Sequence, residues 1–508
     1  MRTENLTSEP TIQISSTADG DCLATERKRK GKLGQFLTPQ HVADLMASLF
    51  EGPRDVIRLL DAGAGAGFLT SAFIRRICSE NKKPKKILVT AYEVDPKMIV
   101  PLQQTLLQCM NDCENAGVEF SSEVIAKDFI STIAPTVRKD DFSIQPETFN
   151  FAIVNPPYKK IKADSNHRKQ LLAAGIETTN LYSGFLSLIS KLLVQGGELV
   201  AITPRSFCNG PYFKKFRASF LENMSLRKLH VFESRSVAFK SQKVLQENLI
   251  IHAIKGESKP VRVTVSVSSG APDSRLTERR VKYSDIVSPR DPEQFIHLPV
   301  SNSQKNAAIA VNRLPSTLTD LGLQVSTGRV VDFRAEEFLR MNPEKGTAPL
   351  IYPTHFNGGT IHWPKLNSRK PNAIKIDEHT KNFLIPAGIY VVVKRFTAKE
   401  ERRRIVACLY DPVLIQAQLL GFENHLNYFH MNGKGLPKRL AKGLIAYLNS
   451  TVVDAYFRQF SGHTQVNATD LRNLKYPSAK SLDQLGNKID EKHLSQDQLD
   501  ALIEHDIL

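Results

Sequence analysis

The sequence predicts an α/β protein in which a doubly wound domain is followed by an α+β domain. Three observations predict this architecture. A strand, a glycine-rich turn and a helix follow one another between Val56 and Ile77, the pattern that opens a doubly wound sheet. Apolar strands and amphipathic helices then alternate as far as Lys255, as expected of a parallel sheet covered by helices. Residues 309–480 change to short strands, Gly/Pro turns and helices.

This pattern predicts a division of the chain into five parts. They are a disordered tail (1–30), a catalytic domain (31–255), a connector (256–308), a second domain (309–480) and a C-terminal tail (481–508). The first part is polar and poor in apolar residues, which is typical of disorder. The last is acidic and helix-forming, and we assign it no function.

The amino-acid composition indicates the type of binding partner and the cellular compartment. The 508 residues carry a formal net charge of +16, which favours a polyanionic partner such as nucleic acid. A protein that is basic for other reasons remains an alternative. The 6 cysteines include no second Cys or His pair to complete a metal site, so we expect no metal and reduced thiols in a cytoplasmic protein. The chain has no apolar run of the ~20 residues that a membrane span needs, and we expect no membrane partner.

The glycine-rich turn is the first candidate binding site. Val56 to Leu60 is an apolar strand, Asp61 to Gly67 is the turn, and Phe68 to Ile77 is a helix. Gly63, Gly65 and Gly67 permit positive φ angles and a close approach of the backbone to a ligand. Dinucleotide-binding and S-adenosylmethionine-binding folds share this spacing, so the turn alone leaves both open.

A helix is predicted to precede this turn. Thr38 is a good N-cap and Pro39 suits the first helical position. The segment is either an ordinary capped helix or one whose N-terminus and Thr38 hydroxyl face a polar ligand group.

Acidic residues follow the next two strands. Glu93 follows the strand Ile87 to Tyr92 and can accept hydrogen bonds from both ribose hydroxyls. Asp95 is the competing candidate, although Asp95-Pro96 also suits the start of a helix. Asp128 follows a third strand and can accept from an adenine amine, with Phe129 against the ring. Either residue can also be a routine loop residue.

The segment FNFAIVNPPY, Phe149 to Tyr158, carries the strongest chemical signal. It begins as a buried strand and stops at two consecutive prolines, which cannot continue a hydrogen-bonded ladder. An exocyclic amine on a heterocycle is a poor nucleophile because its lone pair is delocalised. The side-chain oxygen of Asn155 and the carbonyl of Pro156 can accept its two N–H groups and favour a pyramidal nitrogen, while Tyr158 stacks on the ring. The alternative is a strand-ending turn with an exposed tyrosine.

The chain then returns to alternating helices and strands. Residues 159–180 are polar and predict a loop, and the helix Leu181 to Leu193 is expected to end at Gly196-Gly197. Phe239 lies between two later strands, where its ring can cover the second face of a base or belong to the core.

Together these segments resemble the gamma class of N6-adenine DNA methyltransferases of restriction–modification systems. The order and spacing of motifs agree between residues 34 and 255. The chain length and the segment Gly462 to Leu471, GHTQVNATDL, resemble the PstI/BsuBI modification methylases, which implies the recognition sequence CTGCAG. The resemblance implies a Rossmann-like catalytic domain, a target-recognition domain, double-stranded DNA as substrate, a monomer on DNA and a partner restriction endonuclease that the methylation protects against.

The resemblance also implies roles for the residues named above. The methionine end of S-adenosylmethionine would lie near Thr38, Pro39 and Asp61 to Gly67, its ribose at Glu93, and its adenine at Asp128 and Phe129. A flipped target adenine would be held by Asn155, Pro156, Tyr158 and Phe239.

The second domain contains the candidate DNA contacts. Residues 389–410 predict two strands around a basic loop, and 425–433 and 465–472 add Asn, Gln and His groups that can reach phosphates and base edges. The candidates are Lys394, Arg395, Arg402, Arg403, Arg404, Gln465 and Asn467. The alternative for the loop is a solvated turn.

Four other functions compete with this interpretation. An RNA methyltransferase or a protein-glutamine methyltransferase can use the same Asn-Pro-Pro-Tyr corner. Enzymes of the second kind carry no large basic domain after the corner, whereas about 350 residues follow here. A nicotinamide-dependent oxidoreductase gives that corner no purpose. A DNA-binding module with a vestigial catalytic fold does not explain Asn155 and Tyr158.

Overall fold

The computed structural model describes residues 38–52, 54–138, 146–233, 247–272, 274–462, 464–489 and 494–508. The predicted N-terminal tail and Phe239 therefore lie outside the described residues. The chain divides into two compact units, Met1–Thr203 and Pro204–Leu508. The five-part division expected from the sequence stays a prediction, and each unit is described below by itself.

Unit 1 is built on a parallel sheet whose strand order is β3-β2-β1-β4-β5. The strands are β1 (Val56–Ala62), β2 (Lys86–Tyr92), β3 (Glu119–Ile125), β4 (Phe149–Val154) and β5 (Leu193–Pro204). The chain moves outward from β1 to β3 and then returns to the other side of β1 with β4. The carboxyl ends of β1 and β4 therefore form a topological switch point, where open α/β sheets bind their ligands.

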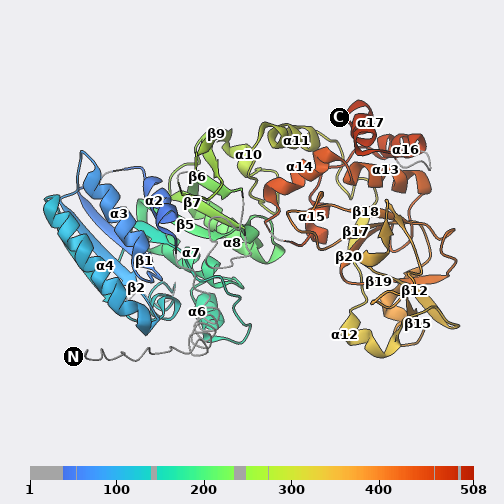
Figure 1. The fold of residues 1–508 in the computed structure, drawn as a ribbon, viewed down its shortest axis with the longest axis horizontal. Coiled ribbons are helices and arrows are strands. Elements are labelled where there is room, and N and C mark those ends of the chain that lie inside the picture. The colour runs from blue at the N-terminus through green and yellow to red at the C-terminus, as the bar shows by residue number, and fades with distance from the viewer. Residues whose placement is uncertain are drawn as a thin grey trace, which may run out of the picture. The chain divides into compact units, whose positions relative to one another are not determined.

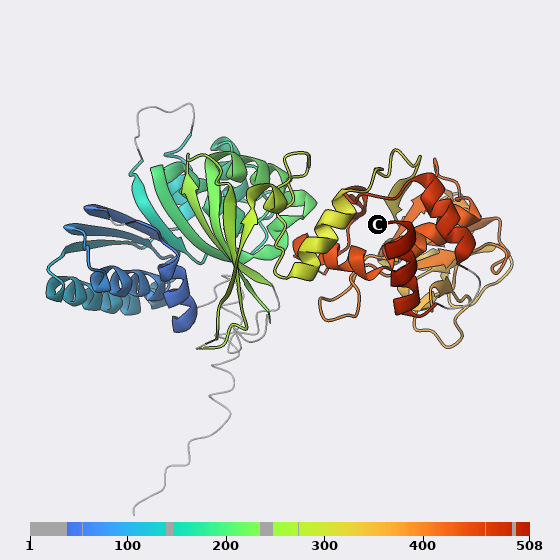
Figure 2. The same ribbon diagram turned by 90° about the horizontal axis from the view of Figure 1, so that it is seen from above.

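Helices precede β1 and connect the parallel strands of unit 1. They are α2 (Gln40–Ser48), α3 (Phe68–Ser79), α4 (Pro96–Asn115), α5 (Phe129–Ile133), α6 (Asn166–Ala173) and α7 (Leu181–Leu192). Helices α3 and α4 lie side by side along one face of β1 and β2 (Figures 1 and 2). The doubly wound α/β fold is confirmed by this topology.

Three local predictions in unit 1 were wrong. Pro39, not Thr38, is the N-cap of α2, because the Thr38 hydroxyl is engaged elsewhere. The segment 159–180 contains α6, a helix with a single buried residue, Leu171, and hence no apolar periodicity. Helix α7 ends at Leu192 and the chain enters β5 directly, so Gly196-Gly197 lies inside a strand.

Unit 2 begins with a mixed sheet in the order β7-β6-β8-β9. Its elements are η1 (Arg205–Cys208), η2 (Pro211–Phe213), α8 (Lys214–Asn223), β6 (Met224–Phe232), β7 (Asn248–Lys255), β8 (Arg262–Ser268), β9 (Thr277–Lys282) and α10 (Tyr283–Ile286). The two strands expected before and after Phe239 are confirmed as β6 and β7.

Two further sheets and a group of helices form the rest of unit 2 (Figure 1). One sheet has the order β10-β20-β17-β18-β14-β13 and the other β11-β15-β12-β19-β16. The strands are β10 (Gln324–Thr327), β11 (Leu339–Arg340), β12 (Thr347–Ile351), β13 (Phe356–Asn357), β14 (Thr360–Ile361), β15 (Ala373–Lys375), β16 (Leu384–Pro386), β17 (Tyr390–Lys394), β18 (Ala407–Tyr410), β19 (Leu419–Phe422) and β20 (Leu426–His430). The helices are α11 (Asn302–Asn312), α12 (Asp332–Ala335), η4 (Glu336–Phe338), η5 (Pro353–His355), η6 (Lys381–Phe383), α13 (Lys438–Leu448), α14 (Thr451–Phe460), α15 (Ala468–Arg472), α16 (Ala479–Lys488) and α17 (Gln496–Asp506).

The C-terminal segment is helical, as predicted, and it is packed rather than detached. Helix α16 lies against α13 (Figure 1). Glycines allow this approach, since a Cβ on Gly443 would lie 1.9 Å from the carbonyl oxygen of Leu482, and one on Gly486 would lie 1.9 Å from that of Arg439. Within the described ranges, no helix combines the length and the apolar character of a membrane span.

Candidate active site

A cavity of about 360 Å³ lies in unit 1 and gathers residues from five separate segments. Its lining follows β1, β2, β3 and β4 and includes helices α6 and α7. Six of the predicted site residues line it: Gly63, Gly65, Glu93, Asp128, Phe129 and Asn155. The sequence interpretation thus named segments far apart in the chain that the fold brings to one cavity.

The glycine turn forms the cavity wall after β1. Gly63, Gly65 and Gly67 have φ angles of +84°, +59° and +84°, which side-chain-bearing residues rarely adopt. The N–H groups of Gly63 and Ala64 both donate to the carbonyl of Tyr92 at 2.9 Å, which fastens the turn to β2. Gly67 does not line the cavity. It permits helix packing instead, because a Cβ there would lie 3.0 Å from the side chain of Leu102.

Glu93 is fixed at the next strand end. Only 2% of it is exposed. Its Oε2 accepts from the N–H of Gly65 at 2.8 Å and its Oε1 from the N–H of Asp95 at 2.7 Å. Asp95 caps α4 by accepting from the N–H of Lys97, so the helix-start interpretation of Asp95 is confirmed. Glu93 is therefore the acidic residue of this strand end that lines the cavity.

Asp61 lies behind the cavity wall rather than on it. It is 0% exposed and its Oδ2 accepts from the Thr70 hydroxyl at 2.7 Å. Its Oδ1 has no hydrogen-bond partner among the described residues. Burial, with a smaller contribution from nearby Glu93, raises the pKa of Asp61 to about 7 against the Thr70 hydrogen bond. Asp61 supports the turn in this structure and does not reach the cavity itself.

Asp128 and Phe129 lie where β3 leads into α5. Asp128 is the N-cap of that helix, and its Oδ1 accepts from the N–H of Ser131 at 2.7 Å. Phe129 is 2% exposed. Its ring packs against Tyr92, with centroids 5.1 Å apart, and against Phe185, at 4.9 Å. These rings give the cavity a flat apolar wall beside a carboxylate.

Asn155 follows β4, which pairs with β1 through Leu59–Phe151 and Leu60–Ala152. This pairing places the Asn155 corner beside the glycine turn. Its Nδ2 donates to the Thr38 hydroxyl at 3.0 Å, which holds the amide nitrogen on the Thr38 side and turns Oδ1 the other way.

The rest of the corner is held more deeply. Pro156 is buried, and the Tyr158 hydroxyl donates to the carbonyl of Ile202 at 3.3 Å. The Tyr158 ring meets the edge of Tyr182 at 6.4 Å, and burial raises the Tyr158 pKa above its usual value. Thr38, Pro39, Pro156 and Tyr158 are not among the described residues that line the cavity.

Several cavity residues were missed by the sequence interpretation. Lys159, Lys160 and Lys162 line it from the segment after the corner, and His167 and Phe185 from α6 and α7. The lysines follow the Asn-Pro-Pro-Tyr motif directly, and this adjacency was a usable signal. Nothing in the sequence separates His167 from an ordinary surface histidine. Phe239 lies outside the described residues.

In unit 2 the structure joins the two candidate DNA-binding segments. The N–H of Val466 donates to the carbonyl of Arg395 at 2.7 Å, and the N–H of Thr397 to the carbonyl of Thr464 at 2.9 Å. The predicted strands β17 and β18 flank the basic loop and pair antiparallel. Lys394, Arg395 and Gln465 are partly exposed on these paired segments.

Other candidates of unit 2 face inward. Arg404 is 2% exposed, and its guanidinium lies over the Phe457 ring at 5.8 Å. It is therefore a structural residue, and the DNA contacts proposed below exclude it. Asn427, in the segment 425–433, is 0% exposed and donates to the carbonyl of Val466 at 2.7 Å, so it cannot read a base edge.

The remaining three candidates differ in exposure. Arg402 is exposed and Arg403 is half-buried. Asn467 caps α15 together with Asp470, which occupies part of its amide.

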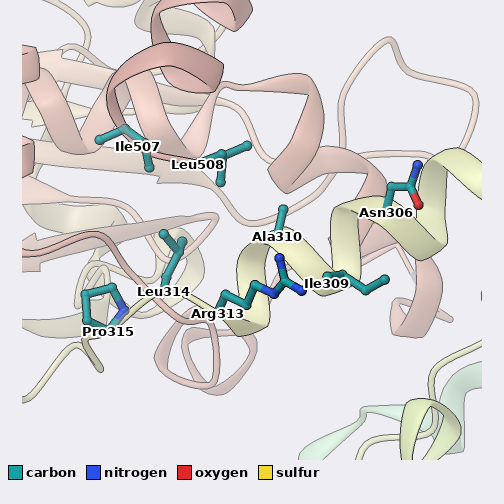
Figure 3. Close-up of a pocket in the computed structure, with 8 residues that line it drawn as sticks. All are labelled: Asn306, Ile309, Ala310, Arg313, Leu314, Pro315, Ile507 and Leu508. Carbon is teal, nitrogen blue, oxygen red and sulfur yellow. The ribbon is translucent and has the colours of Figure 1, made fainter.

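A second cavity, of about 330 Å³, lies in unit 2 near the end of the chain. Figure 3 shows its lining from α11 and from the residues that follow α17. Among the described residues that line it, Arg313 has the one charged side chain and most of the others are aliphatic. This chemistry gives no catalytic constellation, so the candidate site is the cavity of unit 1.

Comparisons with known proteins show which family the chain belongs to. Residues 92–239 match the Eco57I restriction-modification methylase family model. The chain is 44% identical to the type II methyltransferase M.PstI of Providencia stuartii over 492 residues, covering 97% of this chain and 96% of that protein. It is also 44% identical to the type II methyltransferase M.BsuBI of Bacillus subtilis over 506 residues, covering 98% of each chain.

A solved structure of the type IIG restriction endonuclease BpuSI is 13% identical and covers 95% of this chain and 64% of its own, with a TM-score of 0.44. The two relatives of 44% identity are matched over nearly their whole length. The chain therefore belongs to the type II methyltransferases of restriction–modification systems.

Proposed function

We propose that this methyltransferase transfers the methyl group of S-adenosylmethionine to N6 of a flipped-out adenine in double-stranded DNA. The observation that carries the proposal is the position of Asn155. Its amide lines the same cavity as the glycine turn and Glu93, and its nitrogen is held by Thr38. The acceptor oxygen of Asn155 therefore lies beside a cavity large enough for a cofactor.

The family implies S-adenosylmethionine as cofactor, and the residues of the cavity fit it. The buried carboxylate of Glu93 is held by two N–H donors and retains lone pairs for ribose hydroxyls. Asp128 offers a carboxylate beside the Phe129 ring, which suits an aminopurine. Bound there, the cofactor supplies an electrophilic methyl on a sulfonium. Asp61 and Thr38 would support this site from behind the cavity wall, through their hydrogen bonds with Thr70 and Asn155.

The corner after β4 would prepare the nucleophile. Oδ1 of Asn155 and the carbonyl of Pro156 accept the two N–H groups of the adenine amine, which frees its lone pair for attack. Alignment and hydrogen bonding are the work required of the protein here. Tyr158 would stack on the extruded base, and the role of Phe239 as the second ring is part of the same proposal. Extrusion costs a few kcal/mol, which such stacking offsets.

Unit 2 would supply the DNA contacts. The paired segments around Arg395 and Gln465 combine cationic and amide groups, which suit phosphates and base edges respectively. The contact set comprises Lys394, Arg395, Arg402, Arg403, Gln465 and Asn467. A net charge of +16 supports a polyanionic substrate.

The similarity to M.PstI and M.BsuBI over nearly the full chain supports a more specific proposal. The enzyme would recognise CTGCAG, act as a monomer on DNA, and protect cytoplasmic host DNA from a partner endonuclease.

One experiment tests the target atom and the substrate together. The purified chain is incubated with labelled S-adenosylmethionine and either plasmid DNA or RNA, and the product is digested to nucleosides. We expect label in N6-methyl-2′-deoxyadenosine, and only in DNA that contains a CTGCAG site. Label in N4-methylcytosine, in RNA or in the protein fraction would contradict the proposal, and the last two outcomes would favour the RNA or protein-glutamine alternatives.

A further inference from the structure

The cavity of unit 1 contains a histidine that the proposed chemistry leaves without a task. His167 lies on α6, and its Nε2 is 3.0 Å from Oδ1 of Asp128, the N-cap of α5. The two side chains are 33% and 32% exposed, and both line the cavity. The pair joins two helices across the position proposed for the adenine of the cofactor.

The two carboxylate oxygens of Asp128 differ in their hydrogen bonding. The hydrogen bond from His167 and the one from the N–H of Ser131, at 2.7 Å, both reach Oδ1. With Oδ1 held by two donors, the carboxylate cannot rotate freely, and Oδ2 is the oxygen presented to an incoming N–H group. A second link between the same helices, from the Ser131 hydroxyl to the Gln170 side chain at 3.2 Å, reinforces this arrangement.

The electrostatics agree with a paired His167. Its hydrogen bond with Asp128 raises the pKa of His167, against burial and the nearby charge of Lys159. Burial alone would raise the pKa of Asp128, but the His167 and Ser131 hydrogen bonds outweigh it and lower that pKa. The other charged groups that line the cavity are Glu93, Lys127, Lys160 and Lys162.

We propose that His167 is a positioning residue for the cofactor: it holds Asp128 so that Oδ2 accepts the exocyclic amine of the cofactor's adenine ring. The inference rests on the proposed placement of that ring at Asp128. It adds a proton-dependent step to cofactor binding, since the doubly protonated imidazole is the stronger donor to Oδ1.

The test compares two ligands that differ at one group. S-adenosylhomocysteine carries the 6-amino group, and S-inosylhomocysteine carries an oxygen there. Calorimetry on the full chain gives the dissociation constant of each for the wild type and for His167→Ala, His167→Gln and Lys169→Ala. Lys169 lies on the same helix and is exposed, so Lys169→Ala controls for loss of a basic side chain from α6.

We expect His167→Ala to weaken the binding of S-adenosylhomocysteine about tenfold, the factor that corresponds to about 1.4 kcal/mol. The same substitution should weaken the binding of S-inosylhomocysteine by less than about twofold. His167→Gln keeps a donor without a titrating group, so it should bind both ligands nearly as the wild type does at neutral pH. Lys169→Ala should change neither affinity.

The pH dependence gives an independent readout. The His167 pKa is raised, so the protonated pair is complete below the ordinary histidine value and is lost as pH rises through the raised value. Wild-type affinity for S-adenosylhomocysteine should therefore fall as pH rises above the ordinary histidine pKa of about 6.5. His167→Gln should lack this component, and the comparison separates it from Asp61, whose pKa of about 7 lies in the same window.

Equal weakening of the two ligands by His167→Ala, or no weakening of either, overturns the inference while leaving the proposed function intact. Failure of the wild type to bind either ligand contradicts the proposed function itself. If His167→Ala proves unfolded by circular dichroism, the pH profile of His167→Gln decides, since a profile equal to that of the wild type also overturns the inference.

Discussion

The hydroxyl of Thr38 gives the sharpest test of how the catalytic amide is oriented. Thr38 is 6% exposed, and its oxygen accepts from Nδ2 of Asn155 at 3.0 Å. Thr38→Val keeps the shape of the side chain and removes this acceptor. The amide nitrogen then loses this hydrogen-bond partner, which should make a flipped amide easier to reach, and a flipped amide would present a donor where an acceptor is required.

The expected magnitude follows from the cost of leaving a partly buried donor without its partner, about 1–3 kcal/mol. A loss of about 1.4 kcal/mol of transition-state stabilisation corresponds to tenfold in rate. We therefore expect Thr38→Val to lower kcat about tenfold or more, while the KM for the cofactor changes by less than about twofold.

Steady-state transfer of labelled methyl groups to DNA, at varied cofactor concentration, measures kcat and the KM for the cofactor. Thr38→Ser retains the hydroxyl and serves as the control, with a rate close to that of the wild type. An unchanged kcat in Thr38→Val would refute the orienting role. A change confined to the KM for the cofactor would instead assign Thr38 to cofactor binding.

Three further predictions address DNA contact, pH and packing. Arg395→Ala should reduce the slope of log affinity against log salt by about one, as expected for one lost phosphate contact, whereas Arg404→Met, at a buried position, should lower Tm and leave that slope unchanged. The pKa of Asp61 rises to about 7 on folding, so the folded state binds more protons and wild-type stability should fall as pH rises from about 4 to about 7; Asp61→Asn should flatten this part of a chemical-denaturation profile. Gly443→Ala should lower Tm, because a Cβ would lie 1.9 Å from the carbonyl oxygen of Leu482. Helix propensity alone implies that this substitution stabilises the protein by about 1 kcal/mol. A rise in Tm would therefore show that α16 moves away.

The parts of the site that could be predicted are those in which backbone geometry dictates residue type. Positive φ angles at Gly63, Gly65 and Gly67 restrict the turn to glycine, and the prolines after Asn155 end a strand. The apolar runs around them identify buried parallel strands. Because the carboxyl ends of such strands share one edge, Glu93 and Asp128 could also be placed near the turn.

The parts that could not be predicted depend on contacts distant in sequence. Helix α6 buries a single residue, so its pattern does not reveal the helix that carries His167. Arg404 has the positive charge that is typical of a DNA-binding residue, but its guanidinium lies over Phe457 of α14. The pairing of residues 395–397 with 464–466 joins segments about 70 positions apart, and no local pattern specifies it.

The Asn155 corner is the central element of this account, and Asn155→Ala tests it most directly. Labelled methyl transfer to DNA and calorimetric binding of S-adenosylhomocysteine are measured on the same preparation. The account predicts that methyl transfer is lost while the ligand still binds with near-wild-type affinity. Near-normal turnover in this variant would contradict the assigned role of the Asn155 amide.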